Sequence, residues 1–403
     1  MGMEREEKMV VALAGCSHAL SHGYLLIFPA VLLLLQKEFS LNYLQLGIVG
    51  NIMTLTYGLG AFPGGLIYNR IGPKRLYLIC FLGSAFSLAL VAVSPNLAVF
   101  TIGVALLGAL GSVYHPLINA LITSKVRQYG KALGIHGSAG NVGLATAPLV
   151  AGLIASRLGW RNTYLWFILP GVALSIWSLF INMSPREEMK APSSNPGRSL
   201  GLPRNIKAYF SLPLVWLYLI NTFNAFCFYG SSTFLPTYMA QRTSFRLFSL
   251  DKVAMGGMLS GIVLFMGVLG QLSGGLLSQK PFLEKNFLLI SIIAFPFILA
   301  MSFTTNLLLL ILALIYFFFI FCLQPMNNVL LAQYTTLDMR GTAFGLYFSI
   351  SFALGSLASS FSGFIAQKFG LQWVFLGLSA SSLLMIVFIF FLQGIHKPNY
   401  GSA

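Results

Sequence analysis

The stretch Gly60-Ala-Phe-Pro-Gly64-Gly65-Leu66-Ile67 recurs 210 residues later as Gly270-Gln-Leu-Ser-Gly274-Gly275-Leu276-Leu277. A second pair, Gly130-Lys-Ala-Leu-Gly134 and Gly341-Thr-Ala-Phe-Gly345, is separated by 211 residues. Two matches in nearly the same register indicate that the second half of the chain repeats the first. Because the copies fall in apolar runs of the same order and direction, the repeat is parallel, about an axis along the membrane normal.

The composition predicts that most of the chain lies in lipid. Of its 403 residues, 57% are hydrophobic and only 8% are charged, whereas about a quarter of the residues in a soluble domain are charged. One helical crossing of the hydrocarbon layer takes about 20 apolar residues, so the chain has room for about twelve crossings.

Twelve apolar runs are bounded by charged residues or by Pro, Gly and Asn. They are 9–36, 43–68, 76–94, 97–123, 132–156, 162–183, 211–239, 253–279, 286–303, 307–332, 342–366 and 371–392. The polar interval 184–210 is rich in Pro, Ser and Asn, which is typical of a surface linker. We therefore predict an all-α integral membrane protein of two parallel six-helix bundles, 1–183 and 211–403, facing each other across a cavity.

The basic residues predict the orientation of these helices. With the N-terminus inside, 17 of the 24 Lys and Arg residues fall on the cytoplasmic side, so both termini and the linker are expected there. The formal charge of +15 does not indicate nucleic-acid binding, because the basic residues lie in short breaks between apolar runs rather than in a stripe.

The loop after the second run reads Gly65-Leu-Ile-Tyr-Asn69-Arg70-Ile-Gly72-Pro-Lys74-Arg75. It resembles the signature of the major facilitator superfamily, Gly-x-x-x-Asp-Arg-x-Gly-x-Lys/Arg-Arg. In such a loop Gly65 lets helices approach, Gly72 permits a tight turn, and the cations meet helix C-termini and anionic headgroups. Asn69 stands where the superfamily usually has an acid, so we expect the conformational switch to depend more on hydrogen bonding than on a charge pair.

The run 132–156 contains Gly143-Leu-Ala-Thr-Ala147-Pro148-Leu-Val-Ala151-Gly152. It resembles the superfamily's antiporter motif, Gly-x-x-x-Gly-Pro-x-x-Gly-Gly, with alanine at two glycine positions. Small residues let a neighbouring helix pack closely and Pro148 bends the helix, so the same residues also suit a purely structural role. The motif favours export over import.

Val104 stands where drug–proton antiporters usually have an arginine, which argues against their mechanism.

Three further stretches resemble the fosmidomycin-resistance branch of the superfamily. They are Ser17-His18-Ala-Leu-Ser-His22 and Gly111-Ser112-Val113-Tyr114-His115-Pro116, together with the residues around 137–141. His22 stands at a position where this branch often has an acidic residue. The resemblance implies a proton-driven exporter of small anionic or amphiphilic molecules in the bacterial inner membrane. We expect it to act as a monomer and without a cofactor.

Four histidines fall inside the apolar runs: His18, His22, His115 and His136. All nine Asp and Glu residues lie in loops or at helix ends, so no carboxylate is left in mid-membrane to carry a proton. His18 and His22 share one helix face because they are four residues apart. At about 1.5 Å rise per residue, His18 and His115 lie roughly 14 and 12 Å from the cytoplasmic end.

An ionisable residue in lipid usually faces a cavity, and a charged histidine can hold an anion. We therefore predict that these four histidines couple transport to protons. For each one alone, a neutral ring bonded to a backbone carbonyl is the alternative. A zinc site is a second alternative, because His-x-x-x-His with a third histidine suits Zn²⁺. No carboxylate or thiolate obviously joins them, so we expect no metal.

Uncharged polar residues are expected to complete the substrate cavity. They are Asn141, Asn221, Asn224, Tyr229, Gln324, Asn327 and Asn328. Hydrogen bonding between helices is the alternative role for such side chains. The sequence offers no nucleophile–base pair and no phosphate-binding loop that would indicate an enzyme. The leading hypothesis is efflux of a small organic solute in exchange for protons. Uptake of an anionic metabolite or metal chelate and, from another class, a metal-dependent membrane enzyme are the alternatives.

Overall fold

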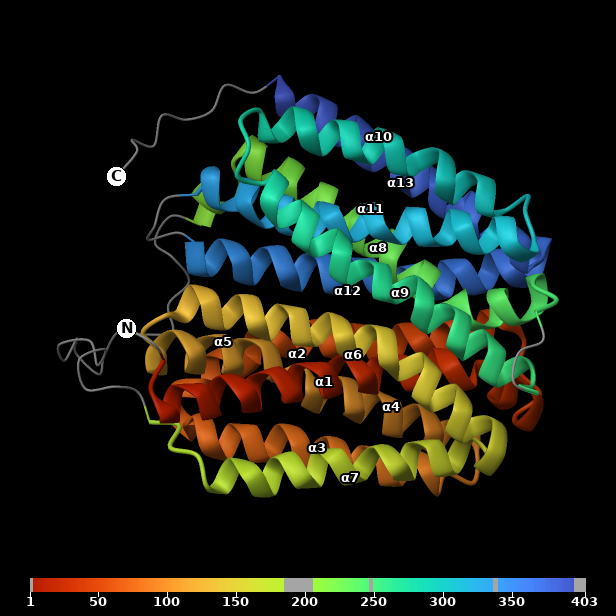
Figure 1. Cartoon of the computed structure of the whole chain (residues 1–403), viewed down its shortest axis with the longest axis horizontal. Helices are drawn as coiled ribbons and strands as arrows, with labels where there is room; N and C mark the ends of the chain where they lie inside the picture. The colour runs from red at the N-terminus through yellow and green to blue at the C-terminus, as the bar shows by residue number, and fades with distance from the viewer. Residues whose placement is uncertain (1–2, 185–205, 246–248, 336–339, 395–403) are drawn as a thin grey trace.

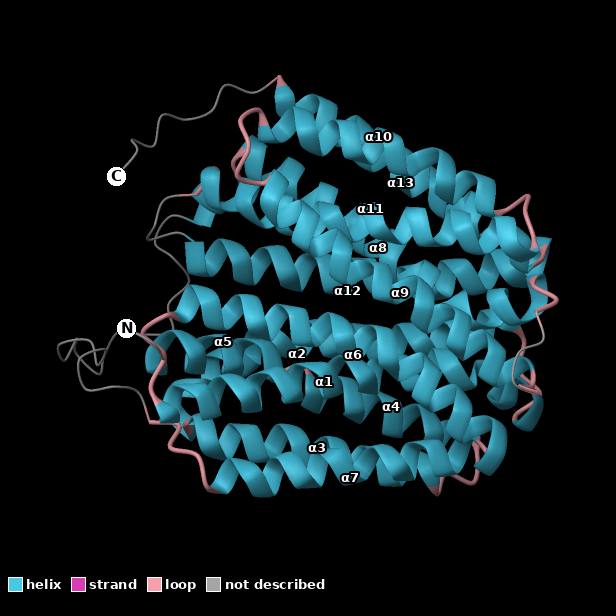
Figure 2. Cartoon of the chain, viewed as in Figure 1, coloured by secondary structure: helices cyan, strands magenta, loops and turns pink. Residues whose placement is uncertain are grey.

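The computed structural model describes residues 3–184, 206–245, 249–335 and 340–394, and these form helices without a strand (Figures 1 and 2). The first half contains α1 (Arg5–Glu38), α2 (Tyr43–Ile71), α3 (Pro73–Ala92), α4 (Leu97–Gly111), α5 (Tyr114–Lys125), α6 (Tyr129–Leu158) and α7 (Trp160–Leu179). The second half contains η2 (Ile206–Phe210), α8 (Leu212–Arg242), α9 (Lys252–Leu277), α10 (Leu283–Met301), α11 (Asn306–Gln333), α12 (Arg340–Phe369), η3 (Leu371–Trp373) and α13 (Val374–Gln393). Most of the predicted linker, residues 185–205, lies outside the described part of the chain.

The helices run roughly side by side, with the start of α1 and the end of α13 at the same end of the bundle (Figure 1). We call this the terminal end and the opposite one the far end. Among the described residues, eleven helical stretches are long and apolar enough to cross a membrane. The 29-residue helix α2 packs among them and completes the twelve predicted crossings. The protein is therefore an all-α, multi-pass membrane protein, as the composition predicted.

The predicted run 97–123 is one crossing made of two helices. Helix α4 ends at Gly111 and α5 begins at Tyr114, with a turn between them. Pro116 explains the break, because proline has no N–H to donate to the carbonyl of Ser112 and its ring crowds that carbonyl. The sequence predicted a continuous helix here. The break therefore corrects that prediction. It also affects the candidate site, because it lies next to His115.

Two crossings of glycine on glycine join the halves near the far end. In the first, between α2 and α12, a β-carbon on Gly47 would lie 3.1 Å from the Cα of Gly363. In the second, between α6 and α9, a β-carbon on Gly152 would lie 3.3 Å from the Cα of Gly257. The internal repeat relates the crossings, since Gly47 and Gly257 are 210 residues apart and Gly152 and Gly363 are 211 apart. Two glycine positions, each present in both halves, therefore form two symmetry-related crossings at the far end.

The terminal end is more open at the corresponding helices. A β-carbon on Gly134 of α6 would meet no atom within 4 Å, and the same holds for its repeat partner Gly345 on α12. Gly275 on α9 also has open space beside it. The halves therefore touch closely at the far end and leave room at the terminal end.

We predict that Gly257→Leu opens the far end. A side chain there would collide with the carbonyl oxygen of Pro148, and overpacking of this kind costs about 1–3 kcal/mol. Such a cost shifts a two-state ratio by about five- to 150-fold. Spin labels on the exposed residues Arg157 and Lys252 should show a longer distance population in the variant.

The matched control for this experiment is Gly134→Leu, which introduces the same side chain where space is free. It should leave the far-end distance unchanged. An identical distance distribution in Gly257→Leu and wild type would contradict the assignment of this crossing as the far-end closure.

Candidate functional site

All four intramembrane histidines meet in one cluster inside the first half. His18 and His22 extend from one face of α1, His115 lies in the first turn of α5, and His136 lies in α6. His18 and His136 are buried, and His22 and His115 are partly exposed. The break between α4 and α5 thus places His115 at the start of a new helix, beside the α1 pair.

The rings of the cluster are in direct contact. His18 stacks on His136 with ring centroids 4.0 Å apart and an interplanar angle of 9°. From His18 the ring centroids of His22 and His115 are 4.6 and 5.1 Å away, and the His22 and His115 centroids are 5.6 Å apart. His18 is therefore the centre of the cluster.

Glycines in α6 make this stack possible. A β-carbon on Gly140 would lie 2.5 Å from the His18 ring, and one on Gly143 would collide with the backbone of Ala19. Helices α1 and α6 can approach this closely only where a side chain is missing. Gly143 was predicted as part of an antiporter-like motif, and here it brings α6 onto α1.

Hydrogen bonds fix which nitrogen of each buried ring carries its proton. His18 Nδ1 lies 2.7 Å from the carbonyl oxygen of His136, so Nδ1–H donates. This leaves His18 Nε2 buried and without a hydrogen-bond partner. The Tyr114 hydroxyl donates to the Ala14 carbonyl at 2.7 Å, so it accepts from His136 Nε2–H at 3.1 Å. The Nε2–H of His136 is therefore bonded, whereas the Nε2 of His18 presents a free lone pair.

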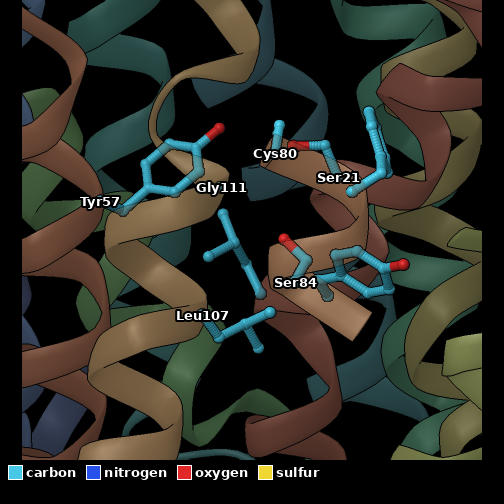
Figure 3. A pocket seen from close by; sticks show the side chains of 9 residues that line it. Ser21, Tyr57, Cys80, Ser84, Leu107 and Gly111 are labelled. Carbon is cyan, nitrogen blue, oxygen red and sulfur yellow. The ribbon is translucent and has the colours of Figure 1, made fainter. Parts of the chain in front are cut away.

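A small pocket lies inside the first bundle beside this cluster (Figure 3). Ser21, on the same face of α1 as His18 and His22, is part of its lining. Tyr57 of α2 also lines the pocket, with its ring centroid 6.1 Å from that of His115. The other lining residues are Tyr24, Leu25, Cys80, Phe81, Ser84, Leu107 and Gly111. The pocket offers hydroxyl groups but no carboxylate.

An aromatic chain leads from the cluster into the second half. Phe352 of α12 lies between Tyr57 and Tyr229, with centroid distances of 6.2 Å to each. Tyr57 in turn meets His115. Tyr229 was predicted as a cavity residue. Tyr57 and Phe352 were not, because nothing in the sequence distinguishes them from the other aromatic residues.

An amide chain links the halves separately. Asn141 Nδ2 on α6 donates to Gln271 Oε1 on α9 at 2.6 Å, and Gln271 Nε2 donates to Gln324 Oε1 on α11 at 2.5 Å. The sequence predicted Asn141 and Gln324 but missed Gln271. A signal for it exists in the repeat, where glutamine at 271 replaces the apolar Ala61 of the first copy.

The other predicted amide side chains lie on α8 and α11 of the second half. Asn221 donates to the Ser351 hydroxyl at 2.6 Å and accepts from Asn327 at 3.2 Å. These bonds fit the alternative role of helix–helix bonding for Asn221 and Asn327. The side-chain oxygens of Asn224 and Asn328 are buried without a hydrogen-bond partner among the described residues. The structure does not join this group to the histidine cluster by a direct contact.

The predicted switch loop is only partly described. Gly72 lies at φ +83°, a left-handed conformation that suits glycine, and it separates α2 from α3. Lys74 Nζ donates to the carbonyl of Leu179 at 3.0 Å, and Arg75 is exposed. The side chains at Gly65, Asn69 and Arg70 lie outside the described set.

The antiporter-like motif packs on two helices at once. Ala147 faces Gly23 of α1, where an added β-carbon would lie 3.6 Å from the Ala147 methyl group. Pro148 and Gly152 face Gly257 of α9. The motif therefore connects the helix that carries His18 and His22 to the crossing that closes the far end.

The chain belongs to the Major Facilitator Superfamily, whose family model matches residues 11–360 and, in a second match, 253–402. The fosmidomycin resistance protein of Escherichia coli (strain K12) is 26% identical, over 94% of this chain and 92% of its own length. The nitrite extrusion protein of Bacillus subtilis (strain 168) is 24% identical, over 59% of this chain and 56% of its own length.

A solved structure has the same fold. It is the crystal structure of a bacterial homologue of the human lysosomal transporter Spinster, in an inward-facing and occupied conformation. Its TM-score is 0.83 and its sequence identity 16%, with 100% of both chains covered. The family and the fold establish a membrane transporter of a small solute rather than an enzyme.

We predict that Tyr114→Phe destabilises the protein by about 1–3 kcal/mol, the cost of leaving a buried polar group unpaired. The substitution removes the acceptor of His136 Nε2–H without changing the shape of the ring. Thermal unfolding in detergent should show a lower apparent Tm.

Tyr164→Phe is the matched control. Tyr164 is equally buried, and its hydroxyl has no hydrogen-bond partner among the described residues. Its loss should leave the Tm nearly unchanged. Equal Tm values for the two variants would show that the Tyr114–His136 bond contributes nothing.

Proposed function

We propose that this transporter exports a small organic anion across a bacterial cytoplasmic membrane, with protons as the coupling ion. The observation that carries the proposal is the histidine cluster, which places four imidazoles in contact inside a bundle whose described carboxylates all lie at or near helix ends. Without a carboxylate to repel it, an anion can approach these rings and the pocket hydroxyls at low electrostatic cost.

The two curated relatives support the solute class and the direction. One carries resistance to fosmidomycin by name, and the other is named for the extrusion of nitrite, which is an anion. The predicted orientation places the terminal end in the cytoplasm. The space beside Gly134 and Gly345 then opens to the inside, where an exporter loads its solute. We propose that one chain is sufficient for this cycle.

The membrane potential favours this direction. Moving one elementary charge through 100 mV is worth about 2.3 kcal/mol, and an inside-negative potential drives an anion outward. In an exchange mechanism, protons enter the cell while the anion leaves. The cluster must therefore bind the proton and the anion in different halves of the transport cycle.

The same residues define the second candidate, proton-coupled uptake. The unpaired Nε2 of His18 is a place where a proton can be added, and the resulting imidazolium attracts an anion. If proton and anion cross together, the inward proton gradient drives accumulation instead of export. The sign of the proton movement therefore separates the two candidates.

We predict that anion addition outside proteoliposomes moves protons outward in the wild type. Fosmidomycin and nitrite are suitable probes, with a pH-sensitive dye in the lumen. Exchange makes the lumen more alkaline as the anion enters, whereas co-transport makes it more acidic. His18→Ala and His115→Ala should each reduce the anion-dependent proton flux at least about tenfold. A positioned proton-transfer group usually contributes more than this, about 10²- to 10⁴-fold.

Tyr164→Phe is the matched control, since it leaves every described contact of the cluster intact. Unchanged proton flux in both histidine variants would remove the histidines from the coupling mechanism. Acidification of the lumen by the wild type would replace export by uptake.

A further inference from the structure

Three of the four histidines are arranged as ligands of a metal ion. One side-chain nitrogen from each of His18, His22 and His115 can be chosen so that all three lie within 4.8 Å of one another. Zinc–imidazole bonds are about 2.0–2.1 Å long, which places tetrahedral nitrogens about 3.4 Å apart. The rings therefore have to close by only a little over an ångström, and His22 and His115 are partly exposed.

The proton positions support this role. A ligating histidine usually donates its other ring N–H to a carbonyl or carboxylate, which fixes the tautomer. His18 does so through Nδ1–H to the His136 carbonyl, and its Nε2 is left buried and unpartnered. His22 and His115 make ring contacts but no hydrogen bond to a described residue. Each of the three rings can therefore keep one nitrogen lone pair free for a ligand bond.

We propose that His18, His22 and His115 together bind one divalent transition-metal ion, with a fourth position for an oxygen of the transported anion. Three imidazoles and one open position form a ligand set that suits Zn²⁺ or Co²⁺. The ion keeps its full double charge, because all three ligands are neutral and mid-membrane holds no carboxylate. An anion at the fourth position offsets that charge.

This inference rests on the proposed function for its fourth ligand alone. It departs from the expectation of no metal, which was based on the lack of a carboxylate or thiolate near the histidines in the sequence. In the proposed site an oxygen of the transported anion takes the place of that ligand, and His115 at the start of α5 completes the set of three imidazoles. The proposal narrows the substrate class to organic anions that carry a metal-binding oxygen.

The test uses untagged, purified full-length protein titrated with Co²⁺ in a buffer without metal-binding groups. The wild type should bind one ion per chain and show the visible absorption of a tetrahedral site. His18→Gln, His22→Gln and His115→Gln should each weaken binding at least about 100-fold, since even outer-shell changes cost 10–100-fold.

His136→Gln is the matched control, because it removes a ring of the same cluster and keeps the carbonyl that His18 needs. It should retain the Co²⁺ spectrum. Absence of the spectrum in the wild type, or the same affinity in all variants, overturns the proposal. If a variant fails to fold, X-ray absorption of the Zn²⁺-loaded wild type decides: three imidazoles support the site, and fewer overturn it.

The fourth position is tested by adding fosmidomycin or nitrite to the Co²⁺ protein. A changed spectrum supports an anion on the metal, and an unchanged spectrum with both probes overturns that part. Flux of the same anions in proteoliposomes with and without a chelator separates this inference from the proposed function. Transport that survives complete metal removal refutes the metal as the anion's anchor while leaving anion export in place. A metal-binding protein that moves neither probe counts against the export proposal only.

Discussion

The cost of placing an unpaired polar group in lipid constrains the whole core of this transporter. His18 can lie in mid-membrane because the His136 carbonyl accepts its Nδ1–H, and His136 because the Tyr114 hydroxyl accepts its Nε2–H. That hydroxyl reaches the backbone of Ala14, which returns the chain of bonds to the helix that carries His18. The cluster is thus supported by three helices and depends on how closely they approach.

Glycine supplies that close approach both at the cluster and at the closure of the far end. Gly140 and Gly143 bring α6 onto α1, and Gly152, further along the same helix, brings it onto α9. One continuous helix therefore contacts both the histidines and the far-end closure. The histidine cluster and the far-end crossing therefore share one structural element, α6.

The fold was largely predictable. Hydrophobic runs identify membrane helices with little ambiguity, because lipid leaves the backbone few alternatives. The repeat of Gly60–Ile67 in 270–277 indicated two matching bundles. The site was predictable in kind but not in shape: the four histidines could be named, yet their stacking order could not. Gln271, Tyr57 and Phe352 escaped prediction, because amide and aromatic side chains acquire their meaning from neighbours that are distant in the chain.

By itself the sequence determined that the chain crosses the membrane about twelve times, that its halves repeat, and that mid-membrane contains histidines but no carboxylates. These properties follow from which residues occur and in what local order. Only the tertiary structure decided that ring nitrogens of His18, His22 and His115 lie within 4.8 Å of one another, because this depends on how α5, which begins after the break at Ser112, packs beside α1. Local sequence specifies a helix, whereas the distance between two helices is set by side chains from both.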